Sequence, residues 1–241
     1  MKQIPTGLIV AMAEELAVVL KDLQHPHTIR HAGLEFHSGT YFDHPVVAVV
    51  CGVGKVNAAL CAQLLITHFQ VGRLINIGIA GGLDPELVPG DIVIADRLVQ
   101  HDVDVSALGL PPGQIYRHPE FDFPTDPAML SLAQEACALI TDHRTKVGCV
   151  ATGDQFIADN QKARYIYQQF GALACEMESA SIAQVCRLNK CPFIVIRSLS
   201  DNANSGAHMD FDAFLPIAVQ NSSILLKAMF QTANNHVSDG K

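Results

Sequence analysis

The chain has few basic residues and no cysteine pair of the C-x-x-C type. Its 16 Lys and Arg residues stand against 24 Asp and Glu residues, which leaves a formal net charge of −8 at pH 7. A nucleic-acid-binding surface is usually basic, so no nucleic-acid partner is expected. Most of the seven cysteines lie in apolar runs. They are typical of buried thiols and predict a cytoplasmic, reducing location.

Long hydrophobic runs are also missing. No apolar run approaches the roughly 20 residues of a membrane-spanning helix, so no membrane partner is expected. Residues 1–16 contain one Lys and a short apolar run, but acidic residues follow and no cleavage-like segment is present. This segment is therefore predicted to form a first strand and not a signal peptide.

The chain does contain apolar runs, and these alternate with segments in which apolar residues have helical spacing. Hydrophobic residues make up 49% of the 241 residues, enough for one large core. The alternation favours an α/β fold, in which a three-layer αβα arrangement surrounds a central mixed, largely parallel, twisted sheet. We expect a single domain over residues 1–233 and a polar, disordered tail over residues 234–241.

The individual elements follow from local pattern. Residues 6–12 predict a strand, and apolar residues at helical spacing between 16 and 23 predict the first helix. A hairpin is expected to turn at Asp43-His44-Pro45, and residues 101–124, rich in Pro and Gly, predict a long loop. Further helices are predicted over residues 56–69, 126–140, 161–170 and 211–230.

Acidic and glycine-rich segments follow the predicted strands. In α/β sheets, ligands bind beyond the carboxyl ends of the strands, an edge that we call the rim. Glycines allow a close approach of the backbone to a ligand. We therefore expect one site at the rim, built from Glu15, Glu176, Glu178 and Asp201 and from the glycine-bearing turns at residues 52–54, 78–82 and 152–156.

Two of these acids flank a methionine in the stretch LACEMESASIAQVC, residues 173–186. Helical spacing places Glu178 on one face with Ile182, and Glu176 on a second, small apolar face. Acids in a first helical turn complement the helix dipole, but a buried carboxylate without a partner is costly. Arg197, inside a predicted strand, is either a buried ion-pair partner for Glu178 or Glu15, or a contact to a ligand.

Familiar phosphate-binding and metal-binding patterns are absent. No G-x-G-x-x-G or G-x-x-x-x-G-K-[ST] segment occurs, and an acidic rim disfavours a polyanionic ligand. Carboxylates instead suit the recognition of neighbouring hydroxyls, the activation of water and proton donation to a leaving group, as in glycoside hydrolysis. No metal site is expected, because the five histidines between residues 25 and 44 lack zinc-like spacing: His25, His27, His31, His37 and His44.

Eight segments together carry a resemblance. GLIVAMAEEL, CGVGKVNAAL, INIGIAGGLDPELVPGDIVIAD, HDVDVSALG, TGDQFI, CEMESASIAQVC, FIVIRSLSD and FDAFL run from about residue 7 to about 215. In this order the chain resembles the bacterial 5′-methylthioadenosine/S-adenosylhomocysteine nucleosidases of the nucleoside phosphorylase/hydrolase superfamily. The resemblance implies a phosphorylase/hydrolase-like fold and hydrolysis of an N-glycosidic bond that releases adenine and a 5-thio-substituted ribose, with no metal or organic cofactor.

The resemblance also implies roles for the acids. Glu15 matches the acid that activates the attacking water. Glu178 matches the acid that binds the 2′ and 3′ hydroxyls of the ribose, with Met177 packed under the sugar. Asp201 matches the general acid that helps to protonate adenine at N7, although Asp at such a place is also a frequent turn or cap residue. Glu176 is a weaker candidate with a structural alternative.

Apolar residues complete the implied substrate site. Phe156 matches an aromatic ring stacked on the purine, and the backbone of Ile157 matches groups that read its edge. Further implied contacts are Met12, Val53 and Phe211 around the 5′ substituent, Ile79, Ala80 and Gly81 in the glycine turn, and Arg197. Val105 and Leu108 match residues that a partner subunit contributes, which implies a homodimer.

Three departures from the family pattern leave the preferred 5′ substituent open. Many relatives carry Ser where this chain has Ile79, Pro where it has Tyr116, and Phe where it has Leu108. An aminofutalosine or futalosine hydrolase is therefore the first alternative. A purine nucleoside phosphorylase, which needs a phosphate site, and a non-catalytic nucleoside-binding module are further alternatives.

Overall fold

The protein is described by a computed structural model that covers residues 3–138, 143–203 and 207–238, with side chains for all of these except 207–212 and 236–238. Ten strands are found among these residues and form one sheet. They are β1 (Thr6–Val10), β2 (Gln24–His31), β3 (Leu34–Tyr41), β4 (His44–Val50), β5 (Arg73–Gly82), β6 (Ile92–Gln100), β7 (Phe123–Pro124), β8 (Thr145–Thr152), β9 (Ala172–Glu176) and β10 (Phe193–Asp201).

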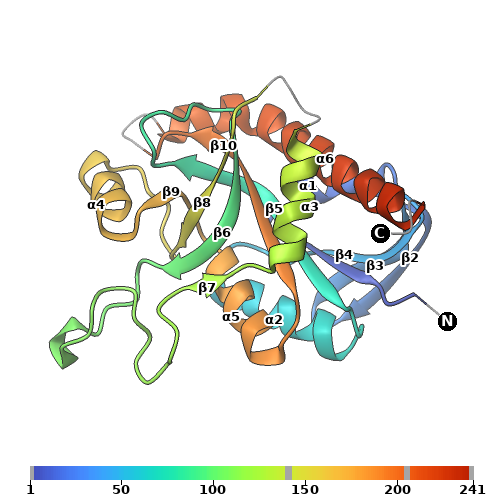
Figure 1. The fold of residues 1–241 in the computed structure, drawn as a ribbon, viewed down its shortest axis with the longest axis horizontal. Coiled ribbons are helices and arrows are strands. Elements are labelled where there is room, and N and C mark those ends of the chain that lie inside the picture. Colours follow the sequence, from blue (N-terminus) through green and yellow to red (C-terminus); the bar gives the residue numbers. More distant parts are fainter. Residues whose placement is uncertain (1–2, 139–142, 204–206, 239–241) are drawn as a thin grey trace.

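The sheet is mixed and closes on itself along one half (Figure 1). β1 lies between β4 and β5, parallel to both. β5 also pairs with β10, which leads through β6 and β8 to β9, and β9 returns to β5 at the pair Gly81–Cys175. Among the described residues, five strand pairings are parallel and five are antiparallel. The α/β fold with a mixed sheet is confirmed, and its parallel share is smaller than expected.

Helices cover both faces of the sheet, as the three-layer prediction requires (Figure 1). The helices are α1 (Ala13–Leu20), α2 (Lys55–Thr67), α3 (Pro127–Cys137), α4 (Asn160–Phe170), α5 (Ser179–Asn189) and α6 (Ala207–Ser238), with a short 3-10 turn η1 (Ser106–Leu108). Side chains of α1, α3 and α6 share one buried cluster with the sheet. Side chains of α2 and α5 share a second cluster on the other face, and α4 packs in a third.

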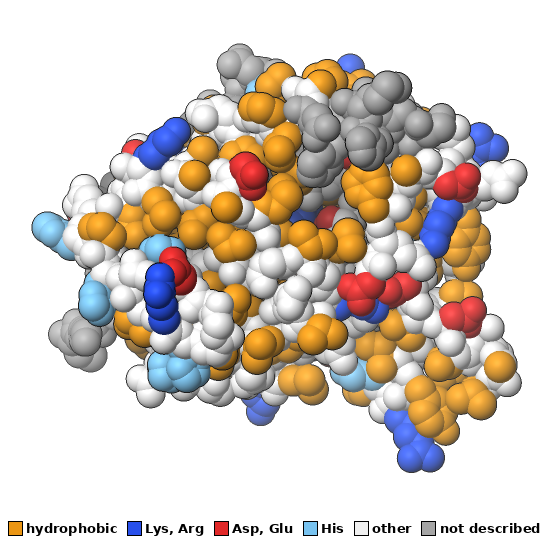
Figure 2. All heavy atoms as spheres, turned by 180° about the vertical axis from the view of Figure 1, so that it is seen from behind, with side chains coloured by type: hydrophobic (Ala, Val, Ile, Leu, Met, Phe, Trp, Pro, Cys, Tyr) orange, Lys and Arg blue, Asp and Glu red, His pale blue; other side chains and the backbone are white. Residues whose placement is uncertain are grey.

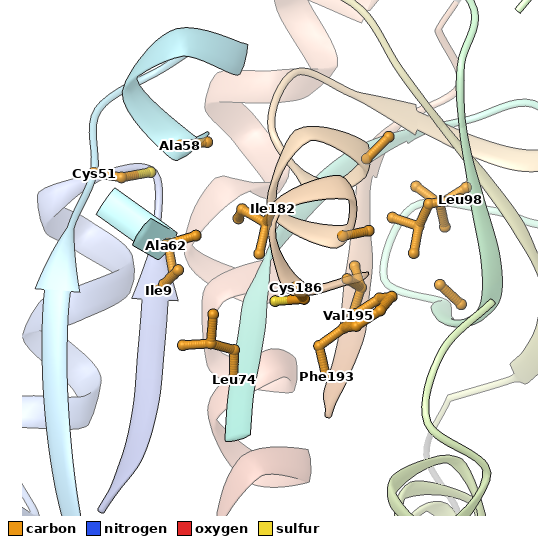
Figure 3. Packing of buried hydrophobic residues seen from close by; sticks show 14 of the residues in the cluster. Ile9, Cys51, Ala58, Ala62, Leu74, Leu98, Ile182, Cys186, Phe193 and Val195 are labelled. Atoms are coloured by element: carbon orange, nitrogen blue, oxygen red, sulfur yellow. The ribbon is translucent and has the colours of Figure 1, made fainter. Parts of the chain in front are cut away.

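The second cluster shows how α5 is held against the sheet (Figure 3). Ile182 and Cys186 of α5 lie beside Ala58 and Ala62 of α2 and are fully buried. Small alanine side chains let the two helices approach closely, and each buried aliphatic side chain contributes roughly 1.5–3 kcal/mol through removal from water. Because α5 begins three residues after the end of β9, this packing fixes the position of Glu176, the last residue of β9, and of Glu178, just before α5.

Local capping explains where several helices begin. Asp126 accepts hydrogen bonds from the backbone N–H of Ala128 and Met129 at the start of α3, with Pro127 in the first turn. Asp159 caps α4 through Lys162 N at 2.8 Å. These helices begin within a residue of the predicted positions, because the capping signals are local in sequence.

The hairpin between β3 and β4 corrects one prediction. Tyr41 pairs with His44, and the turn consists of Phe42 and Asp43, which both have positive φ angles of 46° and 65°. A two-residue turn with this geometry matches the right-handed twist of the flanking strands. The predicted turn at Asp43-His44-Pro45 was therefore one residue too late.

The strand β2 was missed because its polar residues resemble a loop. It is a mostly exposed edge strand that pairs only with β3 among the described strands and contains Pro26, as edge strands tolerate. The five histidines between residues 25 and 44 lie on β2, β3 and the first residue of β4. Among the described residues, no three His, Cys, Asp or Glu side chains are placed to hold one metal ion.

The last helix is longer than its sequence pattern predicted. α6 extends to Ser238, so it includes residues 234–238 of the predicted tail, and residues 239–241 lie outside the described part. Its segment Ala213–Asn235 is long and apolar enough to cross a membrane by length and composition alone, contrary to the expectation from the sequence. Half of the most apolar part is buried in the protein, as in the core helix of a globular domain.

Candidate active site

A cavity of about 380 Å³ lies at the carboxyl ends of the strands. It is lined by residues from the β1–α1, β4–α2, β8–α4 and β9–α5 connections and from the ends of β5 and β10. Thirteen of the predicted site residues line it: Met12, Glu15, Val53, Ile79, Ala80, Gly81, Phe156, Ile157, Glu176, Met177, Glu178, Arg197 and Asp201. The geometry therefore brings the four predicted acids to one hollow, although up to 186 residues of chain separate them.

Glu15 is held rigidly at the start of α1. Its Oε2 accepts hydrogen bonds from the backbone N–H of Ala11 and Met12, both at 2.9 Å, and its Oε1 accepts one from Ile79 at 3.1 Å. Only 3% of the residue is exposed. Burial raises the pKa of Glu15, and the charge of Arg197 and the three backbone N–H groups oppose that rise. The carboxylate is thus oriented by the backbone of two strand ends.

Glu176 lies at the end of β9 and not on the helix that the spacing had predicted. Its Oε2 lies 2.6 Å from Arg197 Nη2, and it accepts further hydrogen bonds from the hydroxyls of Thr152 and Ser179. Burial opposes its ionisation, but the Arg197 guanidinium and the hydroxyl groups hold the pKa of Glu176 below its usual value. This acid is fully occupied by protein partners.

Arg197 is the one basic side chain among the described residues that line the cavity, and it is 2% exposed. Its Nη2 donates to Glu176, to Asn76 Oδ1 at 2.6 Å and to Ser179 Oγ at 2.7 Å. Of the two alternatives for Arg197, the structure shows the buried ion pair, but its partner is Glu176 and not Glu178 or Glu15. The buried ion pair ties β10 to β9 and the start of α5.

Glu178 precedes the first residue of α5 and points toward the β4–α2 connection. Its Oε1 accepts a hydrogen bond of 2.8 Å from the backbone N–H of Gly54. Burial and the nearby charge of Glu176 raise the pKa of Glu178 to about 7, while Arg197 and the Gly54 N–H act in the opposite direction. The second carboxylate oxygen accepts no hydrogen bond from the described residues and is available for a ligand hydroxyl.

Asp201 ends β10 at a register shift between Leu199 and Asp201. Such a bulge redirects a side chain at the end of a strand. Its Oδ1 accepts a hydrogen bond from Ala203 N at 2.7 Å, and its Oδ2 accepts one from Ser200 Oγ at 2.8 Å. With 2% exposure, Asp201 is a buried acid whose orientation is set by its neighbours.

Gly78 makes room for this arrangement. A Cβ atom there would lie 2.6 Å from Arg197 Nη1 and 2.7 Å from Glu15 Oε1. Any side chain at this position would push the guanidinium or the carboxylate away. The glycine of β5 thus permits the approach of an acid from α1 and a base from β10.

The apolar part of the cavity comes from partly exposed side chains. Phe156 and Val53 are 52% and 49% exposed, whereas Ile157 is 6% exposed and anchors its loop in the core around α4. Met177 lies between the two glutamates in the chain and lines the same hollow. An exposed aromatic ring at a cavity mouth offers a face for a planar ligand.

Sequence reasoning missed several cavity neighbours. Ala11, Cys175 and Ser200 also line the hollow, and each adjoins a predicted residue in the chain. Asn76 was missed altogether: it is buried, its Nδ2 donates to Ile9 O, and its Oδ1 accepts from Arg197. A single amide within the apolar run RLINIGI was the available signal, because a buried polar side chain needs partners.

Two predicted residues, Val105 and Leu108, are not among the described residues that line the cavity. Val105 and Leu108 lie at η1, in the loop that projects from the domain (Figure 1), and Leu108 is 62% exposed. The side chain of Phe211 lies outside the described residues.

Comparisons with known proteins identify the family of the chain. The family described as "Phosphorylase superfamily" matches residues 5–231. A 5′-methylthioadenosine/S-adenosylhomocysteine nucleosidase of Psychromonas ingrahamii is 42% identical over 95% of this chain and 99% of its own length. The chain belongs to this nucleosidase family, within the phosphorylase superfamily.

Solved structures of nucleosidases are similar to this protein over almost the whole chain. The nucleosidase of Streptococcus pneumoniae with the transition-state inhibitor MT-ImmA has a TM-score of 0.90 and 39% identity, over 95% of this chain and 100% of that one. A futalosine hydrolase of Helicobacter pylori has the same TM-score and 35% identity, over 95% and 97%. The fold is thus shared with both a methylthioadenosine/S-adenosylhomocysteine nucleosidase and a futalosine hydrolase.

Proposed function

We propose that this enzyme hydrolyses the N-glycosidic bond of 5′-methylthioadenosine and S-adenosylhomocysteine and releases adenine and the 5-thio-substituted ribose. One observation carries the proposal: Glu15, Glu178 and Asp201 line a single cavity of about 380 Å³. This volume is in the range of roughly 300–1,000 Å³ found for small-molecule sites. The family membership supports the same chemistry.

The charges of the site suit bond cleavage at the ribose. As the C1′–N9 bond breaks, its electron pair moves to adenine and positive charge develops on the ribose ring. Three buried glutamates surround one arginine, and Arg197 is paired with Glu176, so the cavity retains acidic groups near the sugar. Fixed negative charge of this kind stabilises a cationic transition state.

Each acid then has a separate task. Glu15, oriented by three backbone N–H groups, accepts a proton from the water that attacks C1′. Glu178 accepts hydrogen bonds from the ribose hydroxyls, and Asp201 donates a proton to adenine. Phe156 and Ile157 bind the base, Met177 packs under the sugar, and Met12 and Val53 contact the 5′ substituent.

Replacement of Asp201 by Asn tests the assignment of the general acid. Asn keeps the size and the acceptor oxygen for Ala203 N but cannot supply the proton, so turnover should fall by a factor of about 10²–10⁴. Adenine release from 5′-methylthioadenosine is measured alongside the thermal unfolding midpoint. Near wild-type turnover in a folded Asp201→Asn protein would refute the role.

The same assay separates hydrolysis from phosphorolysis. Arg197 is the only basic residue among the described lining residues, and its Nη2 is taken by Glu176, Asn76 and Ser179. Adenine release is therefore expected to proceed at the same rate with and without inorganic phosphate. A rate that depends on phosphate would indicate a nucleoside phosphorylase.

Futalosine-type hydrolysis is a second candidate for the 5′ specificity. It is favoured by the similarity to the Helicobacter pylori futalosine hydrolase, which covers 95% of this chain. Comparison of kcat/KM for methylthioadenosine and aminofutalosine decides between them. A higher value for aminofutalosine would move the assignment to that substrate.

We further propose that the enzyme acts as a cytoplasmic homodimer, in which Val105 and Leu108 reach the partner's site. Exposed apolar side chains support this proposal: Leu108 (62%), Val56 (79%) and Leu60 (47%) of α2, and Leu188 (68%) of α5. Figure 2 shows hydrophobic side chains on the lobe that projects at the lower right. The seven free cysteines fit a reducing location.

A further inference from the structure

A cluster outside the catalytic acids joins the two sides of the cavity. Asp102, just after β6, accepts two hydrogen bonds from different segments: its Oδ1 lies 2.7 Å from Lys55 Nζ, and its Oδ2 lies 2.9 Å from Asp154 N. Lys55 is the first residue of α2, and Asp154 lies in the β8–α4 connection. One carboxylate therefore bridges two chain segments 99 residues apart.

Asp154 closes the cluster from the other side. Its Oδ1 accepts a hydrogen bond of 2.8 Å from the backbone N–H of Lys55. The residue before α2 is Gly54, which has no side chain to cap the helix. The Asp154 carboxylate, from a distant loop, therefore accepts the hydrogen bond of the Lys55 N–H. Lys55 is thus held twice, through its main chain by Asp154 and through its ammonium by Asp102.

The ion pair is shielded enough to hold these segments. The Lys55 and Asp102 side chains are 19% and 15% exposed. Burial opposes ionisation of Asp102, but the Lys55 ammonium and the Asp154 N–H keep its pKa below its usual value. Lys55 Nζ also donates to Gln100, whose amide donates to Gln184 of α5 at 2.8 Å. The cluster is thereby connected to the helix that follows Glu178.

Each of the two joined segments carries one half of the substrate site. Gly54, next to Lys55, donates its backbone N–H to the Glu178 carboxylate on the ribose side. Phe156, two residues after Asp154, lies on the base side. Gly54 has a φ of +100°, and a Cβ there would lie 3.2 Å from Asp154 Oδ1, so the two segments touch closely.

We propose that Lys55, Asp102 and Asp154, called the latch below, are positioning residues that hold the ribose-binding and base-binding sides of the cavity in register. The inference rests on the proposed function, because it assigns Glu178 to the ribose and Phe156 to the base. A nucleoside spans both sides and needs them at a fixed separation. Free adenine contacts only the base side, so its binding does not depend on the separation of the two sides. The latch therefore selects for the intact nucleoside over its product.

Kinetics of Lys55→Met test this selection. The KM for methylthioadenosine is expected to rise about tenfold with kcat reduced less than threefold, while inhibition by adenine changes less than threefold. Asp102→Asn should give the same pattern, and the double variant should be no worse than either single one, because both remove one interaction. Lys55→Arg, which keeps the charge, should restore most of the affinity.

Lys227→Met is the matched control. Lys227 of α6 forms a partly exposed pair with Asp22, in the turn after α1, at 2.6 Å, and neither residue lines the cavity. Its kinetics should equal those of the wild type. Equal losses in nucleoside and adenine binding for Lys55→Met, or no change in either, would overturn the selective role of the latch.

Amide hydrogen exchange of the ligand-free proteins gives a readout that is independent of catalysis. Lys55→Met is expected to accelerate exchange in residues 52–57 and 153–157 together, and Lys227→Met in neither. Unchanged exchange in both segments would overturn the latch even in an active enzyme. A wild-type protein that releases no adenine from any nucleoside would overturn the proposed function, while coupled exchange would still support the latch.

Discussion

At the residue scale, the carboxylates of the site differ in their partners more than in their position. Glu176 is paired with Arg197, Glu15 is held by three backbone N–H groups, and Glu178 has a single backbone donor. The pKa values follow: Glu176 is lowered, and Glu15 and Glu178 are raised by burial. Environment thus assigns different roles to chemically identical side chains.

The raised pKa of Glu178 predicts a pH dependence of substrate binding. Below pH 7 this group becomes protonated and accepts ribose hydroxyls less well, so kcat/KM should fall as the pH drops through about 7. The apparent pKa of this pH profile reflects several interacting groups, because the charges of Glu176, Glu15 and Arg197 all act on Glu178. A kcat/KM profile between pH 5 and 9 measures it. A flat profile through pH 7 would contradict the prediction.

The stability of Glu178→Gln provides a second test of the raised pKa of Glu178, independent of catalysis. The folded-state pKa of about 7 lies above the reference value of 4.5, so between these pH values the native protein binds more protons than the unfolded chain. Stability from this group is present below pH 4.5 and is lost as the pH rises to 7. The Gln variant should be more stable than the wild type at pH 8, by about 1–3 kcal/mol, although it binds nucleoside poorly. Urea unfolding at pH 8 checks the sign.

At the element scale, the strand ends and helix starts supply the site. β5 contributes its glycine-rich end, which the sequence had predicted as a turn, β9 and β10 contribute the Glu176–Arg197 pair, and Glu15 lies in the first turn of α1. Most of these elements were predictable, because hydrophobic periodicity and capping residues are local signals. β2 was missed because an exposed edge strand has no apolar alternation, and the position of Glu176 was missed because β9 continues one residue further than its apolar run.

Gly78→Ala tests how strongly β5 constrains the site. The new Cβ would lie 2.6 Å from Arg197 Nη1 and 2.7 Å from Glu15 Oε1, so both side chains must shift. We expect kcat/KM to fall at least about tenfold and stability to fall by about 1–3 kcal/mol. Gly148→Ala is the control. Its Cβ would meet only the flexible Leu173 side chain at 2.6 Å, and activity should remain within about twofold. Equal effects of the two variants on kcat/KM would count against the constraint.

At the scale of the whole molecule, closure of the sheet determines the site. Because β9 returns to β5 at Gly81 and Gly82, the ends of β5, β8, β9 and β10 converge on one cavity. The loop with η1 projects from the rest of the domain (Figure 1), and residues 106–108 are not among the described residues that line the cavity. In the proposed dimer it would complete the site of the partner, so assembly and activity should depend on each other.

Leu108→Asp tests that dependence. A charge in an apolar interface is costly, so the variant should sediment as a monomer and lose most of its activity at low protein concentration. Ile4→Asp changes an equally exposed apolar residue (69%) near the N-terminus and should leave both properties unchanged. Analytical ultracentrifugation with adenine release at the same concentrations provides the measurement. A monomeric wild type with full activity would refute the dimer proposal.

The sequence by itself predicted the class of fold, because apolar periodicity is a local signal. Its resemblance to the family, together with the acids and glycines after the strands, pointed to thirteen residues that line the cavity. It could not decide which carboxylate Arg197 would neutralise, since that depends on how β9 and β10 are placed in space. The closure of the sheet and the contacts of Lys55 with Asp102 and Asp154 are likewise products of the tertiary structure. Asp102 lies 47 residues and Asp154 lies 99 residues from Lys55 in the chain, and only the packing of the folded protein brings them within hydrogen-bonding distance.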